Sequence, residues 1–294
     1  MFSLGSKTIN SPVQLVFYIC IALLAFAGNS ILCRLALADS SIDATSFTLI
    51  RLMSGAVMLC FILLLKGNIK QLKTKGSWPA SLALFIYAAG FSYAYIELDT
   101  GVGALILFAC VQITMLIISW YYGARLTLIE SLGVFVAFAG FIYLVSPGVN
   151  SPSILGVTLM ACAGIAWGCY SIIGSRSATP LIDTSSNFLR ASLICLLLVP
   201  MLFIDTNQLE VMGVVYALAS GMLTSGVGYA IWYKVLPHIR SSVAAVLQLS
   251  VPAIAAIGGL LLLDELLTLK MLMSSGAILG GIGLVIYGKQ QEAK

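Results

Sequence analysis

The sequence has little charge. Only 9% of its 294 residues are Asp, Glu, Lys or Arg, whereas 60% are apolar. A soluble domain usually carries about a quarter charged residues, so this composition excludes an ordinary soluble protein. The net charge is +4, but the basic residues lie in short loops between apolar runs. Without a basic patch, the charge does not predict a nucleic-acid partner.

Residue types typical of reactive sites are also scarce. The chain has one His, His238, and its seven cysteines all lie in apolar stretches without a C-x-x-C pair. We therefore expect no disulfide framework, no metal site and no cofactor. The H-E-x-x-H and G-x-S-x-G patterns are missing as well, which leaves an integral membrane enzyme as a remote alternative.

What the sequence does contain is ten apolar stretches, each of the roughly 20 residues that a membrane-spanning helix needs. They predict an all-α integral membrane protein embedded in a lipid bilayer, with connections too short for a further domain. The predicted helices lie near residues 13–38, 45–65, 77–97, 101–122, 126–146, 154–174, 184–203, 210–236, 241–263 and 268–288.

The distribution of basic residues predicts the orientation. If the loop after the second helix is cytoplasmic, alternation places eleven of the fifteen Lys and Arg residues on the cytoplasmic side and eight of the eleven acids outside. Both termini are then cytoplasmic, by the positive-inside rule. The eleven are Lys7, Lys66, Lys70, Lys73, Lys75, Arg125, Arg176, Lys234, Arg240, Lys289 and Lys294.

The second half of the chain repeats the first. Each half holds five predicted helices, and an odd number means that the two copies enter the membrane from opposite sides. Residues 1–148 and 149–294 are therefore predicted to form two inverted five-helix repeats, the arrangement that supports alternating access. The matches pair Phe26–Asn29 with Ala166–Cys169, Ile42–Asp43 with Ile182–Asp183, Leu49–Arg51 with Phe188–Arg190, Gly90–Ala94 with Gly226–Ala230, and Leu126–Thr127 with Leu267–Thr268.

Several of these motifs resemble the EamA family of the drug/metabolite transporter superfamily. They are Ala27-Gly28-Asn29 and Trp167-Gly168 in the first helix of each half, Arg51 and Arg190 in the second, and Leu263-Asp264-Glu265-Leu266-Leu267-Thr268 after the ninth. The resemblance covers nearly the whole chain. It implies a multi-pass transporter of the bacterial inner membrane, most often an exporter of amino acids or other small metabolites, with a cavity between the halves.

The first half departs from the family pattern at two positions. Ala27 stands where Trp is usual, and the segment Tyr122–Thr127 lacks the acid that Glu265 supplies in the second half. Its counterpart is Ala124, which cannot share a role assigned to Glu265.

Arg51 and Arg190 are the two arginines near the start of the second helix of each half. Inversion places Arg51 towards the outside and Arg190 towards the cytoplasm. They are candidate gating residues or contacts for a substrate carboxylate. The alternative is that each side chain extends to its interface and binds backbone carbonyls there, because a central charge costs about 2.5 to 3.5 kcal/mol.

Polar and aromatic side chains within the helices predict a binding pocket near the midplane. Amphipathic aromatics near helix ends, among them Tyr95 and Tyr233, are better explained as interfacial anchors. Deeper ones need a polar partner and should face the bundle interior, either around a ligand or in hydrogen bonds between helices. The candidate substrate-binding residues are Asn29, Tyr93, Gln112, Trp167, Tyr170, Tyr229 and Gln248.

No acid or His is predicted near the midplane, where a proton antiporter normally holds its relay. Glu97 and Asp99, at the outer end of the third helix, are the nearest candidates. Proton coupling and facilitated diffusion therefore both stay open. The inverted repeat favours a secondary carrier for a small molecule, and the family resemblance implies an amino acid or a related metabolite. Efflux of drugs or organic cations, held by cation–π contacts, is the alternative.

The predicted topology can be tested without knowing a substrate. A cysteine at Ser151, in the loop between the two halves, should react with an impermeant maleimide added outside the cell, because the positive-inside rule places this loop outside. Labelling only after the cytoplasmic side is exposed would reverse the orientation.

Overall fold

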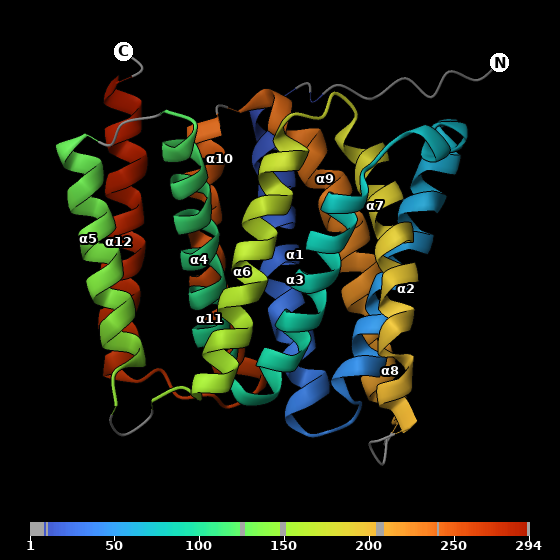
Figure 1. The fold of residues 1–294 in the computed structure, drawn as a ribbon, viewed down its shortest axis with the longest axis horizontal. Coiled ribbons are helices and arrows are strands. Elements are labelled where there is room, and N and C mark those ends of the chain that lie inside the picture. Colours follow the sequence, from blue (N-terminus) through green and yellow to red (C-terminus); the bar gives the residue numbers. More distant parts are fainter. Residues whose placement is uncertain are drawn as a thin grey trace.

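A computed structural model describes residues 9, 11–123, 127–147, 151–203, 209–239 and 241–292. In this part of the chain, ten helices are long and apolar enough to cross a membrane, which confirms the predicted helical membrane fold. They run alternately up and down through one bundle (Figure 1). Among the residues used in the sequence analysis, Lys7, Ala124, Arg125, Leu126, Arg240 and Lys294 lie outside the described residues.

Five helices form the first half. They are α1 (Pro12–Ala38), α2 (Ala44–Leu65), α3 (Trp78–Glu97), α4 (Thr100–Tyr121) and α5 (Leu128–Val145), with a short 3₁₀ helix, η1 (Ile69–Thr74), between α2 and α3. Side chains at the N-caps of α1, α2, α3 and α5 accept backbone N–H bonds that the helices leave open. These caps place the helix starts within a few residues of the predicted ones.

The second half contains five further spans. The first two are α6 (Ile154–Ser175) and α7 (Pro180–Cys195), which continues as η2 (Leu196–Phe203). The third joins α8 (Val211–Ala219), η3 (Ser220–Val227), α9 (Gly228–Val235) and η4 (Leu236–His238). The last two are α10 (Ser241–Gln248) with α11 (Ser250–Leu262), and α12 (Leu269–Glu292). Helix α7 begins four residues before the predicted 184, because Pro180 occupies the first turn, where a missing N–H costs nothing.

Two spans of the second half are irregular. Segment η3 is a π-helix, a wider turn that often marks functional sites. The ninth span breaks at Leu249, between α10 and α11. Pro252 follows three residues later and cannot donate a hydrogen bond to the carbonyl of Gln248, which weakens the helix there.

The helices pack across the two halves of the chain. Helix α3 packs on α6, α1 on α9, α2 on α7, α4 on α11, and α5 on α12. The α5–α12 pair lies at one end of the bundle and α2 with α8 at the other (Figure 1). We call the face where α1 begins and α12 ends the terminal face, and the opposite face the distal face.

The packing of η3 on α2 requires a glycine at position 221. A Cβ there would contact the carbonyl oxygen of Arg51 and the Ser54 hydroxyl, and would lie 3.0 Å from the Gly55 nitrogen. Gly221→Ala should therefore destabilise the protein by about 1–3 kcal/mol, measured as a lower melting temperature in detergent. Gly283→Ala is the matched control, since a Cβ at Gly283 meets nothing within 4 Å. Equal melting temperatures for the two variants would contradict the close packing.

Candidate functional site

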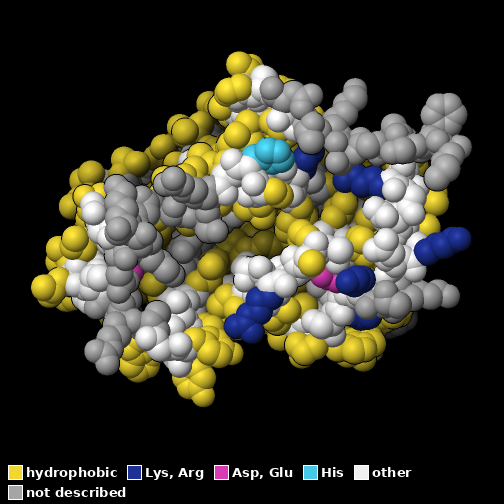
Figure 2. Space-filling model, turned by 90° about the horizontal axis from the view of Figure 1, so that it is seen from above, with side chains coloured by type: hydrophobic (Ala, Val, Ile, Leu, Met, Phe, Trp, Pro, Cys, Tyr) yellow, Lys and Arg dark blue, Asp and Glu magenta, His cyan; other side chains and the backbone are white. Residues whose placement is uncertain are grey.

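A cavity of about 500 Å³ lies inside the bundle. Side chains near the terminal face, including Ser175, Pro180 and Pro237, line one end of it. The other end is lined by mid-helix residues such as Asn29 and Phe91. From the terminal face, Figure 2 shows a hollow among hydrophobic side chains. The cavity thus opens at this face, ends within the bundle, and has the size typical of a small-molecule site.

One wall of the cavity is a stack of aromatic rings. The ring of Trp167 on α6 lies between Tyr170, at 5.2 Å, and Tyr229 on α9, at 5.5 Å, and is nearly parallel to both. Tyr87 on α3 approaches the same indole at 4.7 Å. The hydroxyls of Tyr170 and Tyr233 lie within 3.0 Å of Thr184 Oγ1 on α7. These hydrogen bonds hold the rings in place, so the wall is preorganised.

The deep end of the cavity is polar. Asn29 on α1 donates from Nδ2 to the Tyr87 hydroxyl at 3.2 Å. Its Oδ1 accepts hydrogen bonds from Ser220 at 2.7 Å and Thr224 at 3.3 Å, both on η3. This network connects α1 and α3 of the first half with the π-helix of the second half. The π-helix therefore binds Asn29 through two hydroxyls, and Thr224 lines the cavity as well.

Arg51 lies directly behind this floor. Its side chain is 1% exposed. The alternative expectation, that Arg51 extends to the membrane interface, is therefore wrong. Nη2 donates to the Tyr87 hydroxyl at 3.0 Å, and the guanidinium carbon lies 4.8 Å from the centre of the Phe91 ring. Nε and Nη1 are buried without a hydrogen-bond partner among the described residues. A buried cation without a counter-ion is costly, so an anion at this position would be strongly stabilised.

Arg190 occupies a different environment near the terminal face. Nη2 donates to the carbonyl of Lys75 at 3.1 Å, and the guanidinium lies 5.6 Å from the ring centre of Trp78 at the start of α3. Two neighbours on α7 contact the same segment: Asp183 accepts from the backbone N–H of Gly76, and Asn187 from that of Ser77. Arg190 is thus part of a contact between α7 and α3, and does not line the cavity.

The structure brings most of the predicted binding residues together. Asn29, Gln112, Trp167, Tyr170, Tyr229 and Gln248 all line the cavity. Tyr93 does not, and its hydroxyl lies 2.6 Å from Thr45 Oγ1. Tyr233 lines the cavity although an interfacial position was expected. Tyr95, also expected at an interface, is fully buried and donates to the carbonyl of Thr100.

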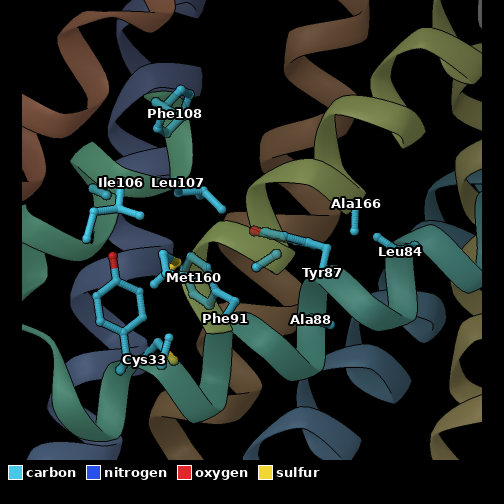
Figure 3. Close-up of a cluster of buried hydrophobic side chains, with 14 of the residues drawn as sticks. Cys33, Leu84, Tyr87, Ala88, Phe91, Ile106, Leu107, Phe108, Met160 and Ala166 are labelled. Carbon is cyan, nitrogen blue, oxygen red and sulfur yellow. The ribbon is translucent and has the colours of Figure 1, made fainter. Parts of the chain in front are cut away.

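Tyr87 is the central residue that sequence reasoning missed. It lies six residues before Tyr93, and at about 100° per residue the two side chains leave α3 on different faces. Phe91, one turn after Tyr87, shares the face towards the cavity; Figure 3 shows both projecting from α3. A buried arginine such as Arg51 needs a hydrogen-bond acceptor, and this requirement could have pointed to Tyr87. Its hydroxyl accepts from Arg51, and its side chain lies on the cavity-facing side of α3.

The chemistry of the cavity suits binding of a small, partly apolar molecule. Ring faces and aliphatic groups make most of the lining, and the amides of Asn29, Gln112 and Gln248 add a few polar groups. No acidic or basic side chain is among the described lining residues. The guanidinium of Arg51 lies behind Tyr87 and Phe91, and the Asp183 carboxylate accepts a hydrogen bond from Ser177, which lines the cavity.

Comparison with known proteins places this geometry among transporters. Residues 154–287 match the model of the EamA-like transporter family. An uncharacterized protein of Pseudomonas aeruginosa is 46% identical over 90% of this chain and 92% of its own length. A probable amino-acid metabolite efflux pump of Escherichia coli is 24% identical over 70% of this chain and 75% of its own. One solved crystal structure, 16% identical, superposes with a TM-score of 0.63 over 96% of this chain and 100% of its own, and so shares the fold.

Removal of the Tyr87 hydroxyl tests the floor of the cavity. Tyr87→Phe leaves the Nη2 group of Arg51 and the Nδ2 group of Asn29 without their bonds, which should cost about 1–3 kcal/mol. The measurement is the denaturation of the detergent-purified protein. Tyr121→Phe is the control, since Tyr121 is 81% exposed at the end of α4. If both variants unfolded alike, the hydrogen bonds would contribute no stability.

Proposed function

Because the chain belongs to the EamA-like transporter family, we propose that it is an alternating-access carrier that exports amino acids or related small metabolites. The E. coli relative, named a probable amino-acid metabolite efflux pump, supports this substrate class. We place the protein in the bacterial inner membrane with both termini on the cytoplasmic side. The cavity then opens to the cytoplasm, as the loading state of an exporter requires.

The observation that carries the proposal is the buried guanidinium of Arg51 behind an open cavity. Two of its nitrogens, Nε and Nη1, have no hydrogen-bond partner among the described residues. If Tyr87 moved aside and freed Nη2, a carboxylate that enters the cavity could bind Nη2 together with either Nε or Nη1, because each of these pairs offers two parallel N–H bonds. The aromatic wall of Trp167, Tyr170 and Tyr229 would then contact the apolar part of the substrate. An amino acid or related carboxylate has both features.

The packing of the helices supports the inverted repeat of residues 1–148 and 149–294. In an inverted repeat, each contact between the halves has a counterpart on the other side. The third span, α3, matches the eighth span, which runs from α8 to α9, and the sixth span, α6, matches α1. The contact of α3 with α6 therefore corresponds to the contact of the eighth span with α1. The α2–α7, α4–α11 and α5–α12 contacts are their own counterparts. Two related halves can exchange conformations, which is the basis of alternating access.

In this cycle the two arginines act at different places. Arg190 holds α7 against the start of α3 at the terminal face, where a gate must close after loading. Arg51 lies at the deep end, where a substrate carboxylate would arrive. No described residue of the cavity lining is acidic, which favours exchange or facilitated diffusion. A proton-coupled cycle would need an acid outside the cavity, and Glu97 and Asp99 lie at the distal end of α3.

Efflux of organic cations is a second candidate, favoured by the aromatic wall. Stacked Trp and Tyr faces attract ammonium groups within about 6 Å of the ring centroid. The positive charge of Arg51 opposes this, because it lies next to Tyr87 and Phe91 at the end of the same cavity. The two candidates differ in one chemical property of the substrate, the sign of its charged group.

A ligand panel measured with purified protein and with liposomes separates them. An apolar amino acid at 100 times its Kd should raise the free energy of unfolding by about 2.7 kcal/mol, whereas the matching amine without the carboxylate should not. Arg51→Gln should abolish this stabilisation and the counterflow of the amino acid, because the guanidinium is lost. Trp167→Ala and Tyr229→Ala should impair counterflow while the protein still folds and inserts.

Two controls are available in the chain. Arg190→Gln removes the matching arginine without touching the cavity lining and should keep ligand stabilisation. Tyr287→Ala removes an aromatic side chain that is 52% exposed near the end of α12 and should keep counterflow. Stabilisation by quaternary ammonium compounds but not by carboxylates would replace the proposal with cation efflux. Normal transport by Trp167→Ala and Tyr229→Ala would remove the aromatic wall from the site.

A further inference from the structure

The distal end of the bundle is closed by a layer of side chains below the cavity. Cys33, Ile106 and Met160 are 0% exposed, and Phe91 and Tyr95 pack against each other at 4.7 Å. They come from α1, α4, α6 and α3, and Figure 3 shows Cys33, Phe91, Ile106 and Met160 close together. Phe91 also lines the deep end of the cavity, and the other four lie nearer the distal ends of their helices than the cavity-lining residues do. An outward-open state would have to part this layer.

Beyond this layer, four segments are held together by a polar cluster. Arg34 on α1 donates from Nη1 to the carbonyls of Tyr95 and Ile96 in the last turn of α3, at 2.8 and 2.9 Å. Its Nε lies 3.4 Å from Oε1 of Glu265, in the loop between α11 and α12. The carboxylate in turn accepts from the Thr100 N–H at 2.9 Å and from the Thr100 hydroxyl at 3.0 Å.

The cluster joins helix ends of favourable polarity. Asp99 is the N-cap of α4, yet its side chain makes no capping hydrogen bond. Glu265 supplies the missing acceptor from a position 165 residues further along the chain. A negative charge is favourable at a helix N-terminus and a positive one at a C-terminus, so Glu265 and Arg34 each stabilise one helix end as well as each other. The two side chains are only 11% and 17% exposed, which limits screening by water.

The local backbone is shaped to deliver Glu265 to this position. Asp264 has a φ of 52°, a left-handed conformation that is rare for residues other than Gly. The Glu265 N–H donates to the carbonyl of Gly259 at 3.2 Å, and a Cβ at position 259 would collide with Oε2 of Glu265. Strain and close packing of this kind persist only where surrounding contacts hold them. The carboxylate of Glu265 is thus inserted between α11 and the start of α4.

We propose that Arg34, Glu265 and Thr100 form the latch of the distal gate, which must break for the cavity to open on that side. Glu265 belongs to the second half of the chain, whereas Arg34 and Thr100 belong to the first. Separation of the halves at the distal face would break every contact between them and Glu265. The latch has no acidic counterpart in the first half, where Ala124 stands at the matching position.

The groups around Glu265 act on its carboxyl in opposite directions. Burial raises the pKa of the Glu265 carboxyl, and the Asp99 charge adds to this, while Thr100 and Arg34 oppose it. The other charged groups around the adjoining outer pocket are Glu97 and Lys270.

Native cysteines report on the latch. The test protein keeps Cys33 alone, with the other six cysteines replaced, and its labelling by a bulky maleimide is followed in detergent. Cys33 is fully buried next to Arg34 and should react slowly. Glu265→Ala or Arg34→Ala should raise the rate about tenfold, equal to a shift of about 1.4 kcal/mol towards the open state. The double variant should label no faster than the faster single variant, because both changes break one latch.

Three controls separate opening from general loosening. Asp264→Asn removes the neighbouring acid with a residue that tolerates its left-handed backbone, and should leave Cys33 protected. A protein that keeps only Cys195, buried on α7, should stay unlabelled in all latch variants. Glu265→Gln, of similar size, takes the place of Glu265→Ala if that variant does not fold, and should also speed labelling.

Unchanged Cys33 labelling in latch variants of normal melting temperature would overturn the latch, as would equal acceleration at Cys33 and Cys195. Stabilisation by carboxylate ligands is measured on the same variants and does not depend on the latch. Loss of that stabilisation in the protein with an intact latch would count against the proposed substrate, whatever the labelling shows.

Discussion

A guanidinium placed in a membrane bundle must be shielded from lipid, and the surroundings of Arg51 follow from this requirement. The side chain lies beside the rings of Tyr87 and Phe91, and the Tyr87 hydroxyl accepts its one hydrogen bond. That hydroxyl also accepts from Asn29, which in turn binds Ser220 on η3. One buried charge thus orients a chain of polar groups across the bundle. Asn29 and Ser220 thus find partners inside the protein, whereas Nε and Nη1 of Arg51 have none among the described residues.

The same chain of contacts explains which parts of the structure were predictable. The ten spans follow from hydropathy, since the bilayer sets the length of an apolar helix. The side of each helix that faces the cavity depends on neighbours distant in sequence. Trp167 and Tyr229 were expected in the site because they are deep and polar-edged, but Tyr87 and Tyr93 are both deep, and only the packing of α3 on α6 decides between them.

The position of a charged residue along a helix likewise does not determine how deeply its side chain is buried. Arg51 and Arg190 stand at matching places in the two halves, yet one is buried in the centre and the other binds the carbonyl of Lys75 near the terminal face. Their environments differ because α7 meets the η1–α3 segment, whose backbone offers partners, whereas α2 meets the π-helix η3. Glu265 presents the same problem, since its partners come from α1 and α4 and no local pattern identifies them.

The two faces hold the halves together in related ways that differ in charge. At the terminal face, Asp183 and Asn187 of α7 bind the open N–H groups at the start of α3. At the distal face, Glu265 binds those at the start of α4, and Arg34 pairs with it. Both contacts use an acceptor from the second half on a helix start of the first, the position where a partial positive charge is available. Among the described residues, only the distal contact adds an ion pair, which fits a state closed on that side and open at the terminal face.

In the proposed carrier, a bound carboxylate would neutralise Arg51 before the floor of the cavity rearranges. An empty carrier would have to rearrange around an uncompensated charge, at a cost of several kcal/mol in low-dielectric surroundings. The return of the empty carrier is then slower than that of the loaded one, and the electrostatics of the floor favour exchange of one substrate for another.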